Sequence, residues 1–373
     1  MRIGIFTESY YPRTDGVAKA LFCFKGALEK RGHEVYVVAP KCEEEGSKDK
    51  HIYYRVSVPF IPYPDYGIAI PVTPKPLKSV DIAHSHSIGG TLLMAQRVAK
   101  KKSVPHITTI HISFQDLLFY FAKNQRLRNL LDFGAKAYFR WFMLKCEGVI
   151  VPSEFLKRQM EELGDMPHIS VVPNPTDIEK FSPFCNGLIV KERLGWDEGP
   201  FVLHVGRLAQ EKNIETLLKA APIIKKCYPE TKFLIVGRGP FEKHLKEMAR
   251  DVRDVLFTGF VPESELPLYY AASDVVCGMS AIETQGLAVI EALSCGKPVV
   301  GANSGAIPDI IKEGKNGLLC NPLDPHECAE CILQILEDEK RRKKMGEVAR
   351  ETALNYEIDK CTDRLIEVYE RVL

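Results

Sequence analysis

Two glutamates, Glu283 and Glu291, lie eight residues apart and are candidates for binding a long polar ligand. Gly286 lies between them and an apolar pattern with helical spacing follows it, so we expect a helix that begins at about Gly286. The free N–H groups and positive dipole end of such a helix bind anions. Glu291 would lie about 12 Å from Glu283 along a helix axis, which suits an extended ligand whose anionic part rests between them. The alternative is a pair of solvated carboxylates.

A second candidate is the loop GRLAQEKN at 206–213, which precedes a predicted helix beginning at Ile214. Arg207 can donate two parallel hydrogen bonds to phosphate oxygens, and Lys212 adds a point charge. Two cations in a loop before a helix N-terminus are typical of a diphosphate site. The alternative is two solvated surface cations.

Three histidines follow predicted strands, His84 and His86 after 80–83 and His111 after 106–110. Because ligands of parallel sheets gather at the carboxyl ends of the strands, we expect all three to face the site. Three histidines can bind a metal ion, but no acidic or cysteine ligand at a suitable spacing accompanies them, so we predict no metal site. A buried structural histidine is the alternative for His84 and His86.

Length and composition limit the classes of function. The chain has 373 residues, enough for two domains, and its 45% hydrophobic and 27% charged content is that of a soluble globular protein. A net charge of +1 provides no general attraction to nucleic acid. No apolar run is long enough to span a bilayer, the N-terminus reads as a strand rather than a signal peptide, and eleven scattered cysteines indicate a reducing compartment. We therefore expect a cytoplasmic protein.

The periodicity predicts an α/β fold. Strand, helix and strand patterns at 2–6, 17–31 and 34–39 indicate a parallel sheet, and further strands are expected at 52–58, 80–83, 106–110 and 148–151. The stretch 173–183 is rich in proline and polar residues and is typical of a link between domains. A second strand and helix series begins at 201, and the chain ends in an amphipathic helix at 356–373.

The segment 117–146 is both basic and aromatic. Such a segment can lie in a bilayer interface, with cations at the headgroups and rings at the acyl boundary. The alternative is core helices whose aromatic side chains pack on the sheet while the basic residues are solvated. A nucleic-acid site has no further support.

The Glu-x7-Glu pair and the G-R-L-x-x-x-K-N string together resemble glycosyltransferase family four, retaining enzymes of the GT-B fold. The resemblance implies two Rossmann-like parallel-sheet domains that face each other across a cleft. Residues 1–175 would form the acceptor domain, completed by a C-terminal helix at 357–373 that crosses back to it. Residues 176–356 would form the domain that binds a nucleotide-sugar donor.

The resemblance also implies residue roles. Glu291 would bind the ribose hydroxyls of the donor, Glu283 the transferred sugar, and Arg207 and Lys212 the leaving diphosphate. The loop at Gly237 would lie near the nucleotide and Val261 near the base. The backbone between the two glutamates would contact sugar and diphosphate through Thr284, Gln285, Gly286 and Leu287.

Two further stretches resemble the diacylglycerol glucosyltransferase branch of this family, namely Asp15-Gly16-Val17 and HISFQDLLFYF from 111. In that branch, Gly16 would lie close to the donor phosphate, and Asp15 and Val17 would contact the acceptor. His111 would lie beside the transferred sugar and the acidic residue downstream, Asp116, would help to form the acceptor site. The chain departs from the branch by having Ile-Ser after the histidine.

The predicted function is transfer of a hexose, taken to be glucose from UDP-glucose, to a lipid hydroxyl such as diacylglycerol with retained configuration. No cofactor is expected, since the nucleotide sugar is a substrate, and the absence of Asp-x-Asp argues against a metal clamp. The expected partners are the donor, the lipid acceptor and an anionic membrane surface, which would make the protein peripheral on the inner membrane face. Three alternatives stay open: a soluble sugar- or inositol-phosphate acceptor, a GT-B sugar-nucleotide epimerase, and a binding protein without turnover.

Overall fold

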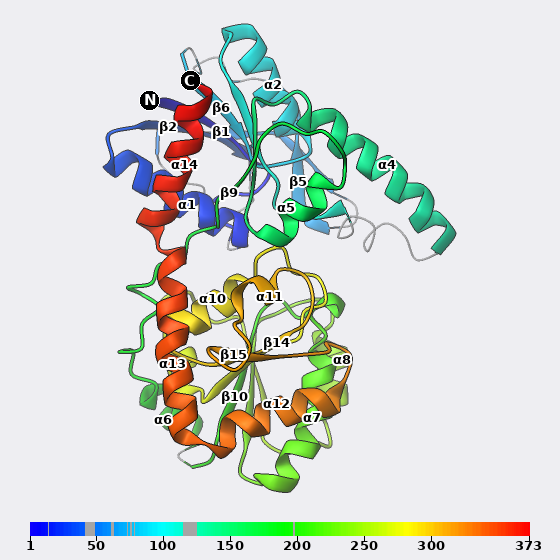
Figure 1. Cartoon of the computed structure of the whole chain (residues 1–373), viewed down its shortest axis with the longest axis vertical. Coiled ribbons are helices and arrows are strands. Elements are labelled where there is room, and N and C mark those ends of the chain that lie inside the picture. The colour runs from blue at the N-terminus through cyan, green and yellow to red at the C-terminus, as the bar shows by residue number, and fades with distance from the viewer. Residues whose placement is uncertain are drawn as a thin grey trace. The chain divides into compact units, whose positions relative to one another are not determined.

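The chain folds into two compact units, Met1–Pro175 with Ile358–Leu373, and Thr176–Glu357. The boundary falls within the proline-rich stretch 173–183. The structure is a computed structural model (Figure 1) and describes residues 1–13, 15–41, 49–60, 63–72, 74, 77, 79–114, 125–196 and 198–373.

The first unit is built on a parallel sheet with the strand order β3-β2-β1-β6-β7-β8-β9. Every residue of its central strands β6, β7 and β8 is buried, as expected of strands covered on both faces. An antiparallel hairpin, β4 (Ser57–Phe60) and β5 (Tyr63–Ala69), accompanies it. The sheet strands are β1 (Arg2–Phe6), β2 (Glu34–Pro40), β3 (Ile52–Arg55), β6 (Ile82–Ser85), β7 (His106–Thr109), β8 (Gly148–Val151) and β9 (Ile169–Val171).

Helices connect these strands, and the last helix of the chain joins them. The helix α14 (Ile358–Val372) packs on this unit beside α1, where the Arg31 guanidinium pairs with Asp359 and Asp363 at 3.0 and 2.9 Å. The crossing C-terminal helix is therefore confirmed. The other helices described here are α1 (Gly16–Lys30), α2 (Gly90–Lys102), α4 (Gln125–Met143) and α5 (Glu154–Glu161).

The second unit has a six-stranded parallel sheet with the order β12-β11-β10-β13-β14-β15. Numbered within the unit, this is 3-2-1-4-5-6, the doubly wound Rossmann order. The order reverses between β10 and β13, so the loops after these two strands diverge at the point where such sheets bind ligands. The strands are β10 (Phe201–Val205), β11 (Lys232–Val236), β12 (Val255–Gly259), β13 (Val275–Gly278), β14 (Val299–Ala302) and β15 (Gly317–Cys320).

The helices of the second unit cover both faces of its sheet. Local residues specify where α12 begins. The Asp324 carboxylate caps its N-terminus, and Pro325 occupies its first turn. The helices are α6 (Leu188–Leu194), α7 (Ile214–Cys227), α8 (Glu242–Met248), α9 (Leu266–Ala272), α10 (Leu287–Ser294), α11 (Ile307–Ile310), α12 (Pro325–Glu337) and α13 (Glu339–Ala353), with 3₁₀ turns η1 (Gln210–Lys212) and η2 (Leu354–Tyr356).

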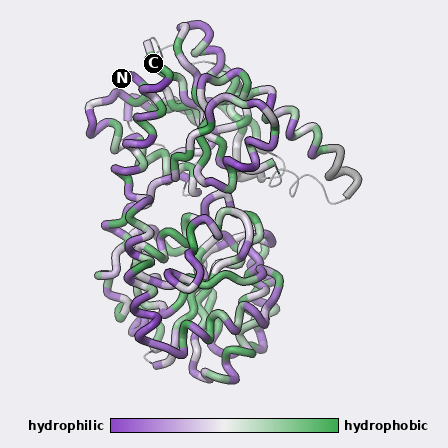
Figure 2. Tube along the Cα trace, in the orientation of Figure 1, coloured by the Kyte–Doolittle hydropathy of each residue, from purple (hydrophilic) through white to green (hydrophobic). Residues whose placement is uncertain are grey.

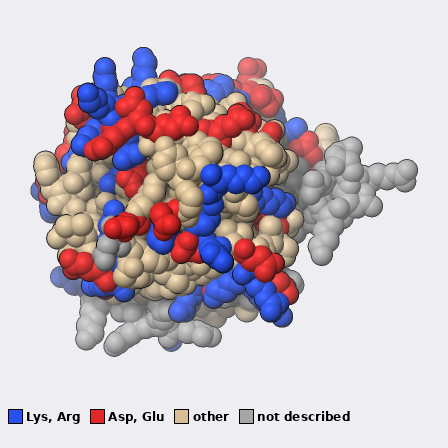
Figure 3. All heavy atoms as spheres, turned by 90° about the horizontal axis from the view of Figure 1, so that it is seen from below, with Lys and Arg blue, Asp and Glu red and all other residues tan. Residues whose placement is uncertain are grey.

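Hydropathy and charge follow this layering. The hydrophobic stretches of the trace lie inside each unit and the hydrophilic ones at the periphery (Figure 2). On the face that Figure 3 shows, basic and acidic side chains are interspersed, as expected of a chain with a net charge of +1. Among the helices that the structure describes, none combines the length and the apolar character needed to cross a bilayer.

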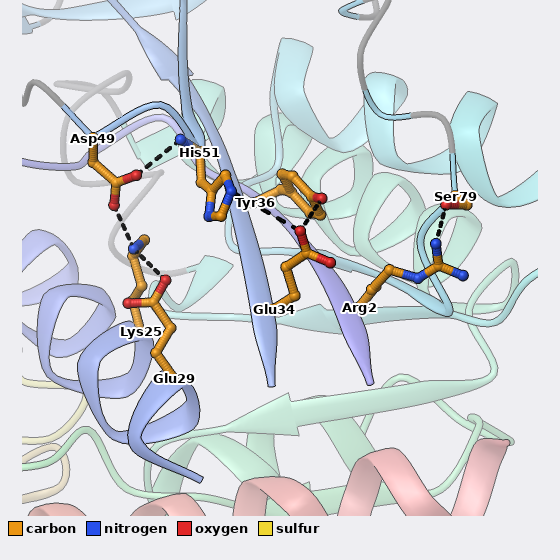
Figure 4. Close-up of polar contacts among 8 residues, drawn as sticks. All are labelled: Arg2, Lys25, Glu29, Glu34, Tyr36, Asp49, His51 and Ser79. Carbon is orange, nitrogen blue, oxygen red and sulfur yellow. Dashed lines mark hydrogen bonds and ion pairs between the residues drawn. The ribbon is translucent and has the colours of Figure 1, made fainter. Parts of the chain in front are cut away.

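A polar cluster ties α1 to the start of β3 (Figure 4). The buried Lys25 ammonium donates to the carboxylates of Glu29 and Asp49, each at 2.6 Å, and Asp49 also accepts the backbone N–H of His51 at 2.8 Å. Burial lowers the pKa of Lys25, but the two carboxylates outweigh it, so that the pKa is raised. The ion pairs therefore keep this buried lysine charged.

Three sequence predictions in the first unit require correction. The strand expected at 80–83 is β6 (Ile82–Ser85), so His84 lies within a strand and not after it. The single strand expected at 52–58 is divided between β3 and β4, and β5 was not predicted at all. Short extended segments carry too little periodicity to locate their ends.

Candidate active site

In the second unit, the predicted cations and Glu283 lie on the two loops that diverge at the sheet's switch point. Arg207 and Lys212 follow β10, and Glu283 follows β13. Because β10 and β13 are hydrogen-bonded neighbours, residues far apart in the sequence emerge at one edge of the sheet. This is the edge at which doubly wound sheets bind nucleotides and other anions.

Lys212 and Glu283 form an ion pair at 2.7 Å, with about a quarter of each side chain exposed (22% and 24%). The Glu283 loop is held in place because the Glu283 carbonyl accepts the N–H of Ala306 at 2.9 Å and Ala281 N–H donates to the Glu211 carbonyl at 3.1 Å. The structure thus brings together two residues for which the sequence predicted separate roles.

Glu291 lies in the fifth position of α10 and only 7% of it is exposed. Its Oε2 accepts the hydroxyl of the fully buried Tyr270, on α9, at 2.8 Å. Burial and the adjacent carboxylate raise the pKa of Tyr270, so the phenol stays protonated and donates. Tyr270 therefore orients the Glu291 carboxylate, a role for which the sequence carries no signal.

Two glycines allow the backbone of this site to pass where a side chain would not fit. Gly286 is the residue before α10 and has φ of +87°, and a Cβ there would lie 2.7 Å from Ile307 Cδ1. Gly237 has φ of +135°, and its Cβ would lie 1.8 Å from the carbonyl oxygen of Gly206. The backbone at Gly237 thus passes close to the loop that carries Arg207. The nearness of Gly237 to a nucleotide stays a prediction.

The other residues predicted to bind the nucleotide sugar differ in their exposure to solvent. Arg207 is exposed at the surface, Gln285 is buried, and Thr284 and Leu287 are half-buried. Val261 is buried in the hydrophobic core beside Leu266. Contact of Val261 with a base stays a prediction.

In the first unit, His86 and His111 meet at the carboxyl edge of the sheet. His86 follows β6, His111 lies just beyond β7, and His86 Nδ1 is 3.0 Å from His111 Nε2. His84 lies within β6 and is completely buried, with Nδ1 2.7 Å from the Tyr369 hydroxyl and Nε2 2.7 Å from Thr109 Oγ1. The expectation that His84 faces the site was therefore wrong.

Burial determines the charge of these histidines. It lowers the pKa of His84 and His86 well below the usual value, and neighbouring histidines lower it further. Burial also lowers the pKa of His111 to about 4, although the charge of Asp15 opposes the shift. All three imidazoles are consequently neutral at pH 7.

Asp15 has a structural role that the sequence prediction did not include. Its Oδ1 accepts the backbone N–H groups of Val17 and Ala18 at 3.0 and 3.1 Å and caps α1, and its other oxygen accepts the Ser9 hydroxyl. Gly16 and Val17 thus form the first turn of α1. Their contact with donor and acceptor stays a prediction, and Asp116 lies outside the described residues.

Within the described ranges, no three histidine, cysteine, aspartate or glutamate side chains form a cluster able to hold a metal ion. The second unit carries the anion-binding elements, and the first unit carries the neutral imidazoles. A loop cation paired with a carboxylate, a glycine-started helix and an oriented buried glutamate are suited to a ligand with a diphosphate and several hydroxyl groups.

Comparisons with known proteins identify the family of this chain. The family model for Glycosyl transferases group 1 matches residues 189–352, and that for Glycosyltransferase Family 4 matches residues 14–180. The alpha-monoglucosyldiacylglycerol synthase of Streptococcus pneumoniae is 31% identical over 350 residues, which is 90% of this chain and 78% of that protein. The D-inositol 3-phosphate glycosyltransferase of Corynebacterium urealyticum is 36% identical over 215 residues, 54% of this chain and 50% of that protein.

Among solved structures, the sucrose-phosphate synthase of Thermosynechococcus elongatus superposes with a TM-score of 0.79 at 19% identity, over 99% of this chain and 98% of that one. Its likeness concerns the fold, which is GT-B. Together with the two family models and the similarity to the streptococcal enzyme over most of both chains, the fold leads to one conclusion. The chain belongs to glycosyltransferase family 4.

Proposed function

We propose that the protein transfers glucose from UDP-glucose to the free hydroxyl of diacylglycerol with retention of the anomeric configuration. The observation that carries this proposal is the 31% identity to an alpha-monoglucosyldiacylglycerol synthase over 90% of the chain. The name of that enzyme specifies both the sugar and the lipid. The residues at the switch point of the second unit support the same chemistry.

The residues at the switch point of the second unit are suited to stabilising a diphosphate as it leaves the sugar. As the bond from the sugar C1 to the phosphate oxygen breaks, negative charge builds on the diphosphate. Arg207, Lys212 and the N–H groups at the start of α10 stabilise that charge, and Lys212 is held in place by Glu283 before the reaction. Glu283, paired with Lys212, would bind the sugar, and Glu291, oriented by Tyr270, the ribose hydroxyls. The charge stabilisation needs no metal ion.

The acceptor hydroxyl would attack from the face that the diphosphate leaves. A neutral His111 beside the sugar can exchange hydrogen bonds with its hydroxyls without adding charge, because its pKa is lowered to about 4 by burial. The departing phosphate oxygen would accept the proton of the attacking hydroxyl. Neither Glu283 nor Glu291 then needs to act as a nucleophile, in contrast to the paired carboxylates of retaining hydrolases.

Product analysis tests this function. We expect the protein to convert UDP-glucose and diacylglycerol in mixed micelles to an alpha-linked monoglucosyl lipid, identified by mass spectrometry and the anomeric proton coupling. An isomerised donor in the absence of any acceptor would identify an epimerase instead, and a bound donor that is never consumed would identify a binding protein. Either result would overturn the proposed transfer.

A soluble acceptor is the second candidate. It is favoured by the 36% identity to a D-inositol 3-phosphate glycosyltransferase, although this extends over only 54% of the chain. An assay that offers diacylglycerol and inositol phosphate in competition separates the two. A product formed only on inositol phosphate would exclude the lipid acceptor.

The helix α4 presents a surface suited to a bilayer interface. Two aromatic side chains of α4 are exposed, Phe133 (77%) and Trp141 (44%). Leu144, just after the helix, is 51% exposed. The Lys145 ammonium lies 3.5 Å from the centroid of the Trp141 ring. Exposed rings beside cations can bind at the boundary between acyl chains and anionic headgroups. Other aromatics of this segment, such as Phe142, are buried in the core. The core interpretation therefore holds for the buried face, and the proposal of a bilayer contact concerns only the exposed one.

Liposome sedimentation tests the membrane partner. We expect the protein to bind vesicles rich in anionic lipid, and Phe133→Ala with Trp141→Ala to weaken the partitioning at least about tenfold, since each large side chain contributes roughly 1.5–3 kcal/mol on burial. Phe184→Ala is the matched control, because Phe184 is 94% exposed but lies in the other unit. Equal binding by all three proteins would remove α4 as the membrane surface.

A further inference from the structure

The His204 imidazole lies at the base of two loops, the loop 206–213 and the loop that follows β13. His204 is the fourth residue of β10, and only 4% of it is exposed. Its Nδ1 lies 3.0 Å from the carbonyl oxygen of Cys277, on the neighbouring strand β13. We propose that His204 is a positioning residue that holds the two loops at the spacing at which Lys212 and Glu283 pair. Its consequence for catalysis rests on the proposed function, in which Lys212 stabilises the leaving diphosphate.

The partner of His204 determines which ring nitrogen carries the proton. Burial lowers the pKa of His204 to about 4, although the hydrogen bond to Cys277 opposes the shift, so the ring is neutral at pH 7. A neutral imidazole carries one proton, and a carbonyl oxygen can only accept a hydrogen bond. The proton is therefore on Nδ1, which donates to the Cys277 carbonyl, and Nε2 carries a lone pair.

This hydrogen bond lies where the backbone pairing of the two strands reaches the switch point. The pairing of β10 with β13 extends to Leu203 and Val276. His204 and Cys277 are the next residues in register, and there the His204 side chain makes the connection. A Cβ at Gly206 would lie 3.5 Å from His204 Nε2. The ring thus lies between Cys277 on one side and the first residue of the loop 206–213 on the other.

Two further contacts join the same loops farther along the chain. The Ala281 N–H donates to the Glu211 carbonyl at 3.1 Å, and Lys212 and Glu283 form their ion pair at 2.7 Å. The three contacts follow the same order along both loops, with His204 closest to the sheet. A loop that is held at its base has fewer conformations to lose when residues farther out pair. Loss of the His204 bond should therefore loosen the alignment of Lys212 with Glu283.

Stability of the core does not account for a histidine at this position. His204 Nε2 is buried and has no hydrogen-bond partner among the residues that the structure describes. A buried acceptor without a donor costs at least as much stability as one ordinary hydrogen bond contributes. The bond from Nδ1 therefore brings no net gain, and an apolar ring would fill the same space. The imidazole differs from such a ring in its one directed donor, which joins the two strands from which the loops leave.

A double-mutant cycle in the full chain tests the proposal. We expect His204→Phe, which keeps an aromatic ring but lacks the donor, to lower kcat by about two- to tenfold, the effect of one ordinary hydrogen bond. In the Lys212→Ala background the same change should cause no further loss, because His204 acts through Lys212. His204→Asn should keep kcat within about twofold, because its amide N–H can replace the Nδ1–H donor.

Thr231→Val is the matched control for His204→Phe. Thr231 is also completely buried in the second unit, and its hydroxyl donates to the backbone carbonyl of Tyr228 at 2.8 Å. It lies just before β11, at the amino end of the same sheet and so away from the switch point. The control should leave kcat unchanged, which separates the loss of a buried hydrogen bond in general from the loss of this one.

Two results would overturn the positioning role. One is an equal loss of kcat on His204→Phe in the unsubstituted and Lys212→Ala backgrounds. The other is a ¹⁵N NMR signal of His204, assigned by its absence in His204→Asn, that shows the proton on Nε2. If His204→Phe does not fold, His204→Leu, which also lacks the donor, replaces it in the cycle.

Amide hydrogen exchange separates this proposal from the proposed function, because it needs no substrate. Loss of the His204 donor should speed exchange of the Ala281 amide by about two- to tenfold, since that amide joins the same two loops. An unaltered Ala281 amide would contradict the proposal. Faster exchange with unchanged kcat would confirm that His204 positions the loops and instead contradict the place of Lys212 in the proposed function.

Discussion

Lys212→Ala is expected to lower kcat by about 10²- to 10³-fold, the loss typical of removing one preorganised donor to developing negative charge. The structure adds a reason why the effect falls on kcat. Lys212 is already held by Glu283 at 2.7 Å, so its ammonium is in place before the diphosphate departs. The KM for the nucleotide sugar should change much less, because in the proposed function the ground-state donor keeps its contacts with Arg207 and α10.

The control for Lys212→Ala is Lys225→Ala, which removes a lysine from another partly buried ion pair of the same unit, with Asp254 at 2.7 Å. It should leave kcat unchanged once thermal melting confirms that the protein is folded. Initial rates with a radiolabelled donor measure both variants. Normal turnover by Lys212→Ala, or an equal loss in the two variants, would show that Lys212 has no specific role in the transfer.

Glu291→Gln is expected to weaken binding of the nucleotide sugar by about 10- to 150-fold, which corresponds to roughly 1.5–3 kcal/mol for hydrogen bonds to a charged group. The buried Glu291 carboxylate can accept two ribose hydroxyls while it also accepts the Tyr270 hydroxyl. An amide replaces one acceptor oxygen by a donor, so the match with the diol is lost. The kcat at saturating donor should fall less.

Isothermal titration with UDP and UDP-glucose measures this effect. Ser294→Ala is a suitable control, because Ser294 is also buried on α10 and its hydroxyl donates to the carbonyl of Ile290 within the same helix. Tyr270→Phe should have an intermediate effect of about two- to tenfold, since the carboxylate remains but is less well oriented. Unchanged affinity in Glu291→Gln would remove this residue from the donor site, whatever the kinetics of Lys212→Ala.

Much of the architecture could be predicted from local patterns. The helix expected from Gly286 is α10, which begins at Leu287 with Gly286 before it, and the final amphipathic helix is α14. Two Rossmann-like sheets were expected and are present. These features depend on residues that are close in sequence, such as a glycine before an apolar helical repeat, and the physical rules that specify them act over a few residues.

The ends of short strands were less predictable, with consequences for the site. A shift of the predicted strand by two residues, from 80–83 to Ile82–Ser85, moved His84 from the expected site into the core. Asp15 is predicted to contact the acceptor, which stays a prediction, and the structure adds that its Oδ1 caps α1. In both cases a polar residue at the edge of the sheet can act either in the fold or on a ligand, and only the packing of the neighbouring elements distinguishes these roles.

By itself, the sequence determined the family, the two sheets and the identity of the loops that carry Arg207, Lys212 and the two glutamates. Only the tertiary structure decided that Lys212 pairs with Glu283, that Tyr270 orients Glu291, and that Tyr369 reaches His84. These pairs are separated by 71, 21 and 285 positions. The physical reason is that hydrophobic periodicity specifies which face of an element is buried, whereas the choice of polar partner depends on which elements the strand order brings side by side.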